Sequence, residues 1–383
     1  MAGPGQRDSR PSLAGTTYNL LGIMAVLLGL GVVMVASTAP ARNPALTRYL
    51  VMKHTLWLCL SIVALYVAYA VELRTLRRWS AVVLVLSLLT LVGVLVLGVK
   101  VNGARRWYRF GVLSFQPSEL FKVALCLYMA HFFDRERARI KTFFKGFLQP
   151  VAIMGLAFVL ILAQPDFGTA LLVATMTFAM LFVAGIRIIH VLPAVLASAP
   201  LVVGLVVMVP ERIERILAFL DPWKDPQGAG YQVIQSLLAL GSGGLLGVGL
   251  GNSQQKLLFL PEANNDFVFS IVGEELGLVG TASVLLLFAL LFWYGVRVAR
   301  RAPDLFSSLL VFGLTLMIGL QAVVNIAVVT CSAPTKGLAL PFVSSGGSSL
   351  VATMVAMGLI LNVASRVEAA TAPRPVGAVR VAG

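Results

Sequence analysis

Ten apolar runs constrain what this chain can fold into more than any other feature of its sequence. They cover residues 18–35, 55–71, 80–99, 118–133, 150–163, 168–185, 188–209, 267–296, 305–330 and 346–365. Most are close to the roughly 20 residues that a helix needs to cross the hydrocarbon core of a bilayer. Hydrophobic residues make up 58% of the 383 positions and charged residues 12%, which is too little polar surface for a water-soluble globule. The sequence therefore predicts an all-α polytopic membrane protein with about ten transmembrane helices.

Clusters of basic residues between the runs predict how the chain is oriented. Cytoplasmic connections of membrane proteins carry an excess of Lys and Arg. With the N-terminus inside, the clusters at 74–78, 135–145 and 297–301 all fall on the cytoplasmic side. We therefore expect both termini in the cytoplasm. This organisation predicts a tail at 1–17, a transmembrane domain at 18–366 with a long extracytoplasmic loop at 210–266 between helices 7 and 8, and a second tail at 367–383.

The net charge of +14 does not by itself predict nucleic acid as a partner. The basic residues lie in short clusters between apolar runs, as topology signals and phosphate contacts do. The three cysteines, Cys59, Cys126 and Cys331, lie in or beside apolar runs without the spacing of metal ligands, so neither a disulfide framework nor a zinc site is expected. The membrane is the partner that the composition indicates.

Asp266 is the leading catalytic candidate because it stands where a polar stretch, residues 252–266, meets the apolar run that follows. A carboxylate at such a border keeps contact with water while it faces a pocket of low dielectric, which favours proton transfer. Asp is also among the preferred N-cap residues, and its charge suits the positive end of the helix dipole. Position alone leaves both interpretations of Asp266 open, general base and helix cap.

Arg105, Arg106 and Arg109 lie among aromatic residues in a connection that the predicted orientation places outside, against the topology rule. Guanidinium groups match phosphate oxygens in pairs, so this segment predicts a diphosphate site, with anchoring among lipid headgroups as the alternative. Glu119 and Lys122 follow at the start of the next run and share one helix face. An ion pair there is costly unless it serves a pocket, so both are candidate site residues.

Two runs, 150–163 and 168–185, fall short of a full span, and the segment Gln-Pro-Asp-Phe-Gly at 164–168 joins them. Short spans around polar residues predict a turn buried at membrane depth. Such backbone is tolerated only where protein or a water-filled cavity surrounds it. Asp166 is therefore expected to face inward, in one polar cluster with the Glu-Lys pair of the preceding span.

Glycine is dense in residues 241–251, as it is in nucleotide-binding loops. The segment lacks a following Gly-Lys-Ser/Thr and a preceding strand, and the predicted orientation puts it on the side of the membrane without nucleotides. No nucleotide cofactor is therefore expected, and flexible or tightly packed backbone beside a substrate groove is the better explanation. Residues 232–240 are expected to form a short helix along the membrane surface.

The last external connection presents a cation and several hydroxyl groups at the membrane face. Lys336 follows Pro334 and Thr335, and Ser348 and Ser349 stand at the start of the final run. Backbone N–H groups, hydroxyls and a lysine suit an anionic lipid head or a leaving phosphate. An ordinary loop with a serine-rich helix start explains the same residues, and both interpretations stay open.

Together and in order, these motifs resemble the SEDS family, whose members act in shape, elongation, division and sporulation. The resemblance covers roughly residues 19–366. It rests on Asn-Gly-Ala-Arg-Arg-Trp at 102–107, Gln-Pro-Ser-Glu at 116–119, Gln-Pro-Asp-Phe-Gly-Thr at 164–169, Asp-Pro-Trp at 221–223, Leu-Pro-Glu at 260–262, Gly-Glu-Glu-Leu-Gly at 273–277 and Gly-Gly-Ser-Ser at 346–349.

Within the family, two segments of this chain are more similar to the division members than to the elongation members. They are residues 249–256, which end at Lys256, and residues 334–337. The resemblance adds Lys256 to the expected substrate-binding and diphosphate-binding residues. The chain also departs from the family pattern, because Asn264-Asn265 stands where His-Thr is usual and Ser345 stands where Tyr is usual.

The resemblance implies a peptidoglycan glycosyltransferase that polymerises lipid II on the outer face of the bacterial cytoplasmic membrane, at the division septum. The glucosamine 4-hydroxyl of one molecule then attacks the anomeric carbon of the other chain's diphosphate-linked muramic acid, with inversion. Asp266 is the implied general base. Arg105, Arg106, Arg109, Lys336 or a divalent cation, Mg²⁺ or Mn²⁺, would stabilise the leaving diphosphate. The implied partners are lipid II, a class B penicillin-binding protein transpeptidase and other divisome membrane proteins.

Three alternative functions remain at this stage. An elongation-type polymerase of the same family would carry out the same chemistry at another place in the cell. A lipid II flippase needs polar groups near the bilayer midplane, whereas the polar motifs here gather at one face. A scaffold that only recruits a transpeptidase would not need Asp266.

Overall fold

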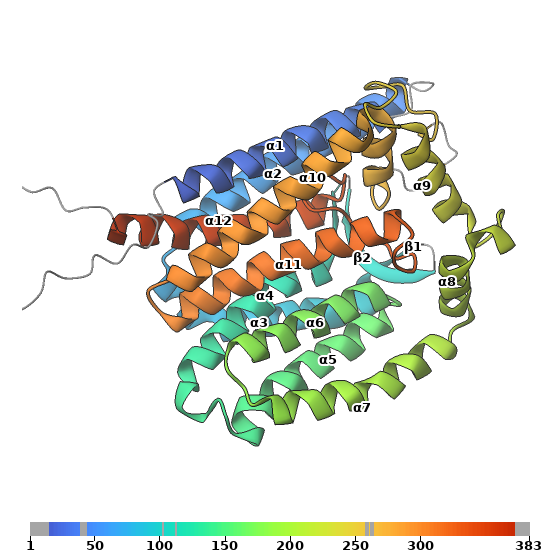
Figure 1. Cartoon of the computed structure of the whole chain (residues 1–383). Helices are drawn as coiled ribbons and strands as arrows, with labels where there is room; N and C mark the ends of the chain where they lie inside the picture. Colours follow the sequence, from blue (N-terminus) through green and yellow to red (C-terminus); the bar gives the residue numbers. More distant parts are fainter. Residues whose placement is uncertain are drawn as a thin grey trace, which may run out of the picture.

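The computed structural model describes residues 15–38, 44–101, 103–111, 113–256, 260 and 264–371. Within these ranges, ten long helices run alongside one another in a single bundle (Figure 1). They are α1 (Thr16–Thr38), α2 (Pro44–Ala70), α3 (Leu73–Leu97), α4 (Pro117–Arg135), α5 (Gln149–Ala163), α6 (Phe167–Val183), α7 (Ile188–Val207), α10 (Val268–Arg301), α11 (Leu305–Val329) and α12 (Gly347–Thr371). The ten predicted runs coincide with these helices. The outer parts of the predicted tails, 1–14 and 372–383, lie outside the described residues.

Eight helices in the described part of the chain are long and apolar enough to cross a membrane. The other two of the ten differ for local reasons. α6 is 17 residues long, and α4 contains four charged residues, Glu119, Lys122, Asp134 and Arg135. Both still run through the bundle beside the longer helices (Figure 1). The chain is a multi-pass membrane protein.

The start of α5 corrects the expectation that the run at 150–163 is too short to span the membrane. A π-helical segment, η2 (Phe143–Leu148), leads directly into α5, so that the apolar helix from Phe143 to Ala163 is 21 residues long. The run predicted as short at 150–163 is therefore part of a full span, and only α6 is short. The two segments are continuous because the backbone N–H of Gln149 donates to the carbonyl of Phe144, which joins η2 to α5.

The helices differ in how deeply they are buried. Most residues of α11 and α12 are buried, whereas α7 buries almost none. Helices α4, α11 and α12 pack against one another, and α12 also packs along α2. The centre of the bundle is therefore formed by the C-terminal helices together with α4, and α7 lies at the periphery (Figure 1).

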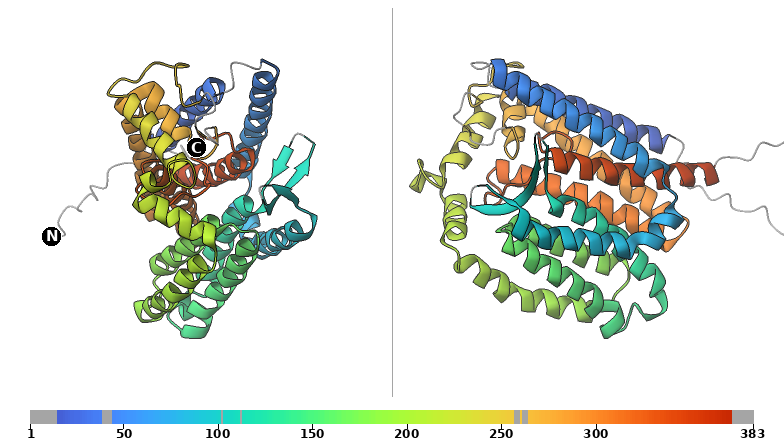
Figure 2. Two further views of the ribbon diagram at one scale, coloured as in Figure 1. Left: turned by 90° about the vertical axis from the view of Figure 1, so that its right-hand side faces the viewer. Right: turned by 180° about the vertical axis from the view of Figure 1, so that it is seen from behind.

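The two ends of the bundle carry different parts of the chain. The start of α1 and the end of α12 lie at one end, where the backbone N–H of Thr17 donates to Oε1 of Glu368 at 3.0 Å. The strands and the helices of the long connection lie at the opposite end, as the two further views in Figure 2 show. The described parts of the segments predicted to lie outside the cell are therefore at one end of the molecule.

A small antiparallel sheet follows α3 and is absent from the sequence interpretation. Its strands are β1 (Val99–Val101), β2 (Ala104–Phe110) and β3 (Leu113–Phe115), in the order β1-β2-β3. The sheet lies at the end of the bundle (Figure 2), where β2 packs beside α3 and β3 beside α12.

The long connection after α7 contains two helices, α8 (Pro210–Leu220) and α9 (Tyr231–Ser242), with a 3-10 turn at Pro222–Lys224 between them. The short helix expected at 232–240 is confirmed as α9. α8 is not part of the sequence interpretation. It begins at Pro210, a favoured first helical residue.

The glycine-rich segment packs against a break in α10. The helix changes direction at Gly277, whose φ of 66° and ψ of −162° are open to glycine alone at low cost. A Cβ there would lie 2.4 Å from the backbone nitrogen of Gly247. The N–H of Val248 donates to the carbonyl of Glu274 at 3.0 Å, so the loop pairs with backbone freed by the break. Gly243 and Gly247 thus allow this close packing.

Candidate active site

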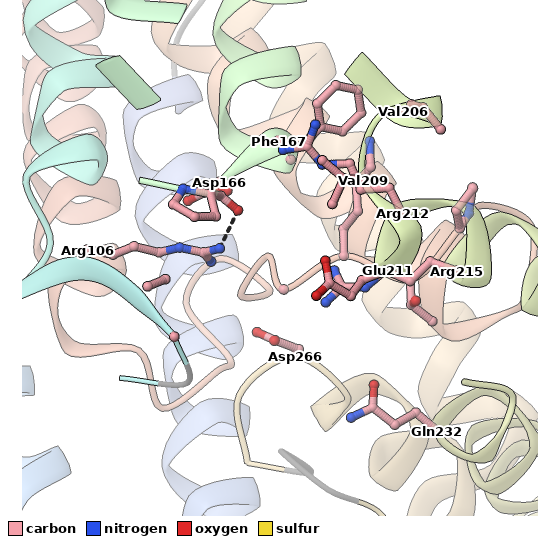
Figure 3. A pocket seen from close by; sticks show the side chains of 18 of the residues that line it. Arg106, Asp166, Phe167, Val206, Val209, Glu211, Arg212, Arg215, Gln232 and Asp266 are labelled. Carbon is pink, nitrogen blue, oxygen red and sulfur yellow. Dashed lines mark hydrogen bonds between the residues drawn. The ribbon is translucent and has the colours of Figure 1, made fainter. Parts of the chain in front are cut away.

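Asp266 lies where two cavities meet at the end of the bundle that carries the strands. The larger cavity has a volume of about 690 Å³ and the smaller one about 350 Å³, both within the usual size of small-molecule sites. The larger cavity is bordered by α6, α7, α8 and α9 (Figure 3), and the smaller by α2, β2, β3 and the start of α12. The residues that line both cavities are Val101, Arg106, Trp107, Asp166, Asp266 and Gly337.

The carboxylate of Asp266 stands in the wall of both cavities. The N-cap of α10 is Phe267, whose hydrocarbon side chain cannot accept a hydrogen bond. Asn325 of α11 donates its side-chain amide to the backbone carbonyls of Asp266, at 2.7 Å, and Leu338, at 2.6 Å. Gly337 passes so close that a Cβ there would lie 2.8 Å from Oδ2 of Asp266. This arrangement favours a group presented to a ligand over a simple helix cap.

Asp166 has the capping role instead. Its Oδ1 accepts the backbone N–H of Thr169 at 3.1 Å, and its Oδ2 accepts the Thr169 hydroxyl at 2.9 Å. The side chain is the N-cap of α6, is buried, and lines both cavities. Asp166 therefore ties the start of α6 to the cavity wall.

Arg106 joins the sheet to the turn between α5 and α6. Its Nε donates to the carbonyl of Gln164 at 2.7 Å, and its Nη2 donates to the carbonyl of Pro165. Figure 3 shows Arg106 beside Asp166, with Asp266 across the cavity. Of the three arginines singled out in the sequence, Arg106 is the one that lines both cavities.

The other two arginines, Arg105 and Arg109, lie apart from Arg106. Arg109 lines the smaller cavity. Arg105 is exposed, and its Nη1 donates to the carbonyls of Leu95 and Val96 at the end of α3. The last carbonyls of a helix attract cations, so Arg105 caps α3 outside the described cavity walls.

Glu119 and Lys122 form a buried ion pair that reaches two further helices. Nζ of Lys122 lies 2.9 Å from each carboxylate oxygen of Glu119 and 2.8 Å from Oε1 of Gln321. Gln321 in turn donates to the hydroxyl of Ser349 at 3.1 Å. Glu119 and Ser349 line the smaller cavity together with Asp166. Glu119 and Asp166 thus share a cavity wall, and Gln321 of α11, which the sequence interpretation missed, joins Lys122 to Ser349.

Lys336 lines the larger cavity, with Nζ 5.2 Å from the centroid of the Phe167 ring. Burial lowers the pKa of Lys336 below its ordinary value, and the nearby carboxylate of Asp166 opposes that shift. The cation is thus held in a partly desolvated place, where an incoming anion interacts with it more strongly than in water.

The larger cavity also contains four residues that the sequence interpretation missed. Arg212 of α8 lies over the Phe167 ring at 5.1 Å and donates to the carbonyl of Leu205 at 2.5 Å. The charged residues of α8 recur every three or four positions, and this spacing in the sequence predicts one charged face of a helix. The four are Glu211, Arg212, Arg215 and Gln232 (Figure 3).

Two residues predicted to bind the substrate, Ser348 and Lys256, do not line the described cavities. Ser348 donates to the carbonyl of Ser114 at 2.8 Å and accepts the N–H of Gln116 at 3.0 Å, so it fastens α12 to the start of α4. Lys256 pairs with the buried carboxylate of Glu275 at 3.2 Å and lies outside the described cavity walls. A contact between Lys256 and a diphosphate stays a prediction, and in this structure the lysine is paired with Glu275 of α10.

A divalent cation would find few carboxylates here. Asp166 and Asp266 line both cavities, and the described residues contain no group of three or more His, Cys, Asp or Glu side chains that could hold a metal ion. In phosphate-handling sites Mg²⁺ uses one or two carboxylates together with substrate phosphates and water. The two shared carboxylates fit a cation that takes its other oxygen ligands from a bound phosphate group and water.

These features define a class: a multi-pass helical membrane protein with a carboxylate-centred double cavity at one end of its bundle. Residues 18–369 match the family described as "Cell cycle protein", which comprises FtsW, RodA and SpoVE, and the chain belongs to this family. The family resemblance drawn from the sequence motifs is confirmed.

Curated relatives match nearly the whole chain. "Probable peptidoglycan glycosyltransferase FtsW" of Geobacter metallireducens is 42% identical over 352 residues, which cover 90% of this chain and 94% of that protein. "Stage V sporulation protein E" of Bacillus subtilis is 41% identical over 346 residues, which cover 89% and 94%.

Solved structures share the fold. A chain from "Structural coordination of polymerization and crosslinking by a peptidoglycan synthase complex" superposes with a TM-score of 0.76 at 34% identity, and the match covers 91% of this chain and 98% of that one. The rod shape determining protein RodA of Thermus thermophilus superposes with a TM-score of 0.67 at 30% identity, covering 91% and 96%.

Proposed function

We propose that this protein is a peptidoglycan glycosyltransferase that polymerises lipid II into glycan strands during septal wall synthesis. The observation that carries the proposal is the position of Asp266, a carboxylate shared by two cavities at the end of the bundle. A polymerase must hold two saccharides on either side of one reacting centre. Two cavities that meet at one potential base supply that arrangement. Relatives named as such enzymes, at about 42% identity, support the same activity.

Asp266 acts as the general base in this proposal. The attacking group is the 4-hydroxyl of a glucosamine, which loses its proton as it bonds to the anomeric carbon of the other molecule. The C–O bond to the diphosphate breaks from the opposite face, and the electron pair leaves with the lipid diphosphate. The configuration at the anomeric carbon is inverted.

Cations of the larger cavity stabilise the leaving group. Four of them line that cavity: Arg106, Arg212, Arg215 and Lys336. Among the described residues, its carboxylates are Asp166 and Asp266, which also line the smaller cavity, and Glu211, which does not. Guanidinium and ammonium groups in a partly desolvated site stabilise charge that develops on phosphate oxygens.

A divalent cation, Mg²⁺ or Mn²⁺, is a second source of positive charge. Asp166 or Asp266 would hold it together with the substrate's phosphate oxygens. When bound, such an ion neutralises the leaving diphosphate.

Orientation and partners follow from the same proposal. The end of the bundle with the cavities faces the outside, both termini face the cytoplasm, and the protein acts in the bacterial cytoplasmic membrane at the septum. A class B penicillin-binding protein transpeptidase and other divisome membrane proteins are the proposed partners. The matching structure described as a peptidoglycan synthase complex supports such an assembly.

An elongation-type polymerase is the nearest alternative, since RodA of Thermus thermophilus shares the fold at 30% identity. A lipid II flippase is disfavoured because the described cavities gather at one end of the bundle. A pure scaffold for a transpeptidase leaves the shared carboxylate without a purpose.

The experiment that tests the function uses the purified full chain in detergent with labelled lipid II. It is incubated alone and with a class B penicillin-binding protein whose own transpeptidase serine is blocked. We expect glycan ladders on a gel in at least the second reaction. Translocation of lipid II in vesicles without any polymer would contradict the proposal and favour the flippase.

A further inference from the structure

The connection between α4 and α5 forms a compact structure at the end of the bundle that carries the start of α1 and the end of α12 (Figure 1). It consists of a 3-10 turn, η1 (Arg137–Arg139), and the π-helical segment η2. Ile140 and Phe147 are buried, and a Cβ on Gly146 would collide with the carbonyl oxygen of Ile140, so glycine lets η2 fold back against the turn. The connection therefore presents a defined surface.

This connection carries an unbalanced positive charge. Residues 137–165 contain no Asp or Glu. The preceding carboxylate, Glu136, has its Oε1 3.9 Å from Nε of Arg135 and so belongs to the end of α4. Four cations of the connection are exposed: Arg137, Arg139, Lys141 and Lys145.

The other two cationic clusters at this end of the bundle include carboxylates. Arg77 of α3 forms an ion pair with Asp134 of α4, and its guanidinium lies 5.9 Å from the centroid of the Phe306 ring. Asp304 follows the cluster at 297–301. An excess of Lys and Arg on one side is common to membrane proteins, so a cluster of cations alone indicates no ligand. The lack of a carboxylate within residues 137–148 distinguishes this connection from the other two clusters.

Apolar side chains are exposed beside these cations. Phe144 is 73% exposed, and Phe143 and Leu148 are exposed as well. The start of α7 continues the surface, because the His190 ring lies 5.5 Å from the Phe143 ring in an edge-on contact. Three exposed residues precede that histidine, a cation and two isoleucines: Arg187, Ile188 and Ile189. We call residues 137–148 and 187–190 together the basic-aromatic surface.

The combination of exposed cations and exposed apolar side chains fits a lipid. η2 is the first part of a helix, Phe143 to Ala163, that is long and apolar enough to cross a membrane, which places its first turn at the level of the headgroups. At that level aromatic rings enter the boundary of the acyl chains while Lys and Arg stay beside phosphates. A soluble acidic protein would match the cations but has no use for an exposed Phe144.

We infer that the basic-aromatic surface binds an anionic phospholipid, which contacts both the connection 137–148 and the start of α7. Lys141 and Lys145 interact with the phosphate, and Phe144 lies beside the acyl chains. α7 buries almost none of its surface in the bundle, so a lipid held here adds a contact to a helix that has few. The inference is independent of the proposed glycosyl transfer, whose candidate residues lie at the opposite end of the bundle.

The test uses the purified full chain in detergent, with phosphatidylglycerol and phosphatidylcholine of identical acyl chains as probes. Native mass spectrometry counts the lipids that stay bound to each protein molecule. The variants are the pair Lys141→Gln with Lys145→Gln, and the single change Phe144→Ser. The matched control is the pair Arg300→Gln with Arg301→Gln, which removes two cations at the same end of the bundle but outside the surface. Thermal unfolding in lipid-free detergent should be equal in all four proteins, because the three replaced side chains of the surface are exposed.

We expect the wild type to bind phosphatidylglycerol more tightly than phosphatidylcholine. The lysine pair should weaken phosphatidylglycerol binding by roughly twentyfold, since a cation near an anionic lipid surface contributes about fivefold. Phe144→Ser should weaken the binding of both lipids by at least about fivefold, because an apolar contact is lost whatever the headgroup. The control pair should bind both lipids as the wild type does.

Two outcomes for the lipids would overturn the inference. One is equal binding of the two lipids by the wild type, and the other is a loss of phosphatidylglycerol binding in the control pair as large as in the lysine pair. Soluble polyglutamate, added in a separate titration, tests an acidic protein as the occupant. If polyglutamate binds to the wild type and loses affinity in the lysine pair, while Phe144→Ser changes the binding of neither lipid, the surface fits an acidic protein and the lipid is excluded.

Discussion

The side-chain amide of Asn325 holds the backbone of Asp266, donating to its carbonyl oxygen at 2.7 Å from the neighbouring helix α11. The same nitrogen donates to the carbonyl of Leu338 at 2.6 Å. One buried side chain therefore joins the segment that carries the proposed base to the loop before α12. This contact fixes where the carboxylate stands relative to both cavities.

Replacing Asn325 by Ala should lower both stability and activity. Two buried carbonyls lose their donor, which costs roughly 1–3 kcal/mol for each unsatisfied group. We expect a lower melting temperature and a lower rate of glycan formation. Asn19→Ala is the matched control, because Asn19 pairs with Tyr294 at an exposed position. Equal behaviour of the two variants would show that Asn325 does not position Asp266.

Lys122→Ala should destabilise the protein strongly. The change leaves Glu119 charged and buried without its partner, at a cost of about 3–5 kcal/mol. The double variant with Glu119→Gln removes that charge and should recover part of the loss. Thermal unfolding of the four proteins in the cycle gives the coupling energy between the two side chains. Independent, additive effects would refute the pair as a unit.

Arg106→Lys should impair glycan synthesis, and Arg105→Lys should not. Two guanidinium nitrogens of Arg106 donate to the carbonyls of Gln164 and Pro165, and the single ammonium nitrogen of a lysine can take the position of only one of them. Arg105 caps the end of α3, where a lysine serves as well. Initial rates with lipid II compare the two variants. If both retain the wild-type rate, Arg106 has no part in the site.

The pH dependence of activity should reveal Lys336. Burial lowers its pKa, so the ammonium loses its proton at a lower pH than an ordinary lysine. The cation is present below that pKa and is lost as the pH rises through it, so diphosphate binding should fall on the alkaline side. Lys336→Arg keeps the charge at high pH and should move this alkaline limit upward. Lys141→Arg, at an exposed position, serves as the control. Identical alkaline limits for the wild type and Lys336→Arg would exclude the role.

The fold was largely predictable because membrane spans depend on simple physical requirements. An apolar run of sufficient length must form a helix in lipid, since its backbone groups have no other partners there. Asp166 and Lys122 were found for the same reason, because charged residues within spans are costly and therefore informative. The small sheet was missed because its outer strands are only three residues long and its central strand combines three arginines with aromatic residues, a composition that resembles an interfacial loop.

The site was only partly predictable because its contacts join distant parts of the chain. Gln321 and Asn325 lie four residues apart on one face of an apolar helix, and that spacing was the available signal for a buried polar face. Arg212 became relevant only when α8 was seen beside Phe167. Lys256 came from the family resemblance alone, and nothing in its local sequence indicated the ion pair that it makes with Glu275.

Glycan synthesis by Asp266→Asn tests the central claim most directly. The amide keeps the size of the side chain but cannot take a proton from the acceptor hydroxyl. The assay uses purified protein, labelled lipid II and a class B penicillin-binding protein, with Asp304→Asn as the matched control, because Asp304 caps α11 through the N–H of Ser307. We predict that Asp266→Asn unfolds at the same temperature as the wild type and makes no polymer, while Asp304→Asn polymerises normally. Near-normal polymerisation by a folded Asp266→Asn protein would contradict the account.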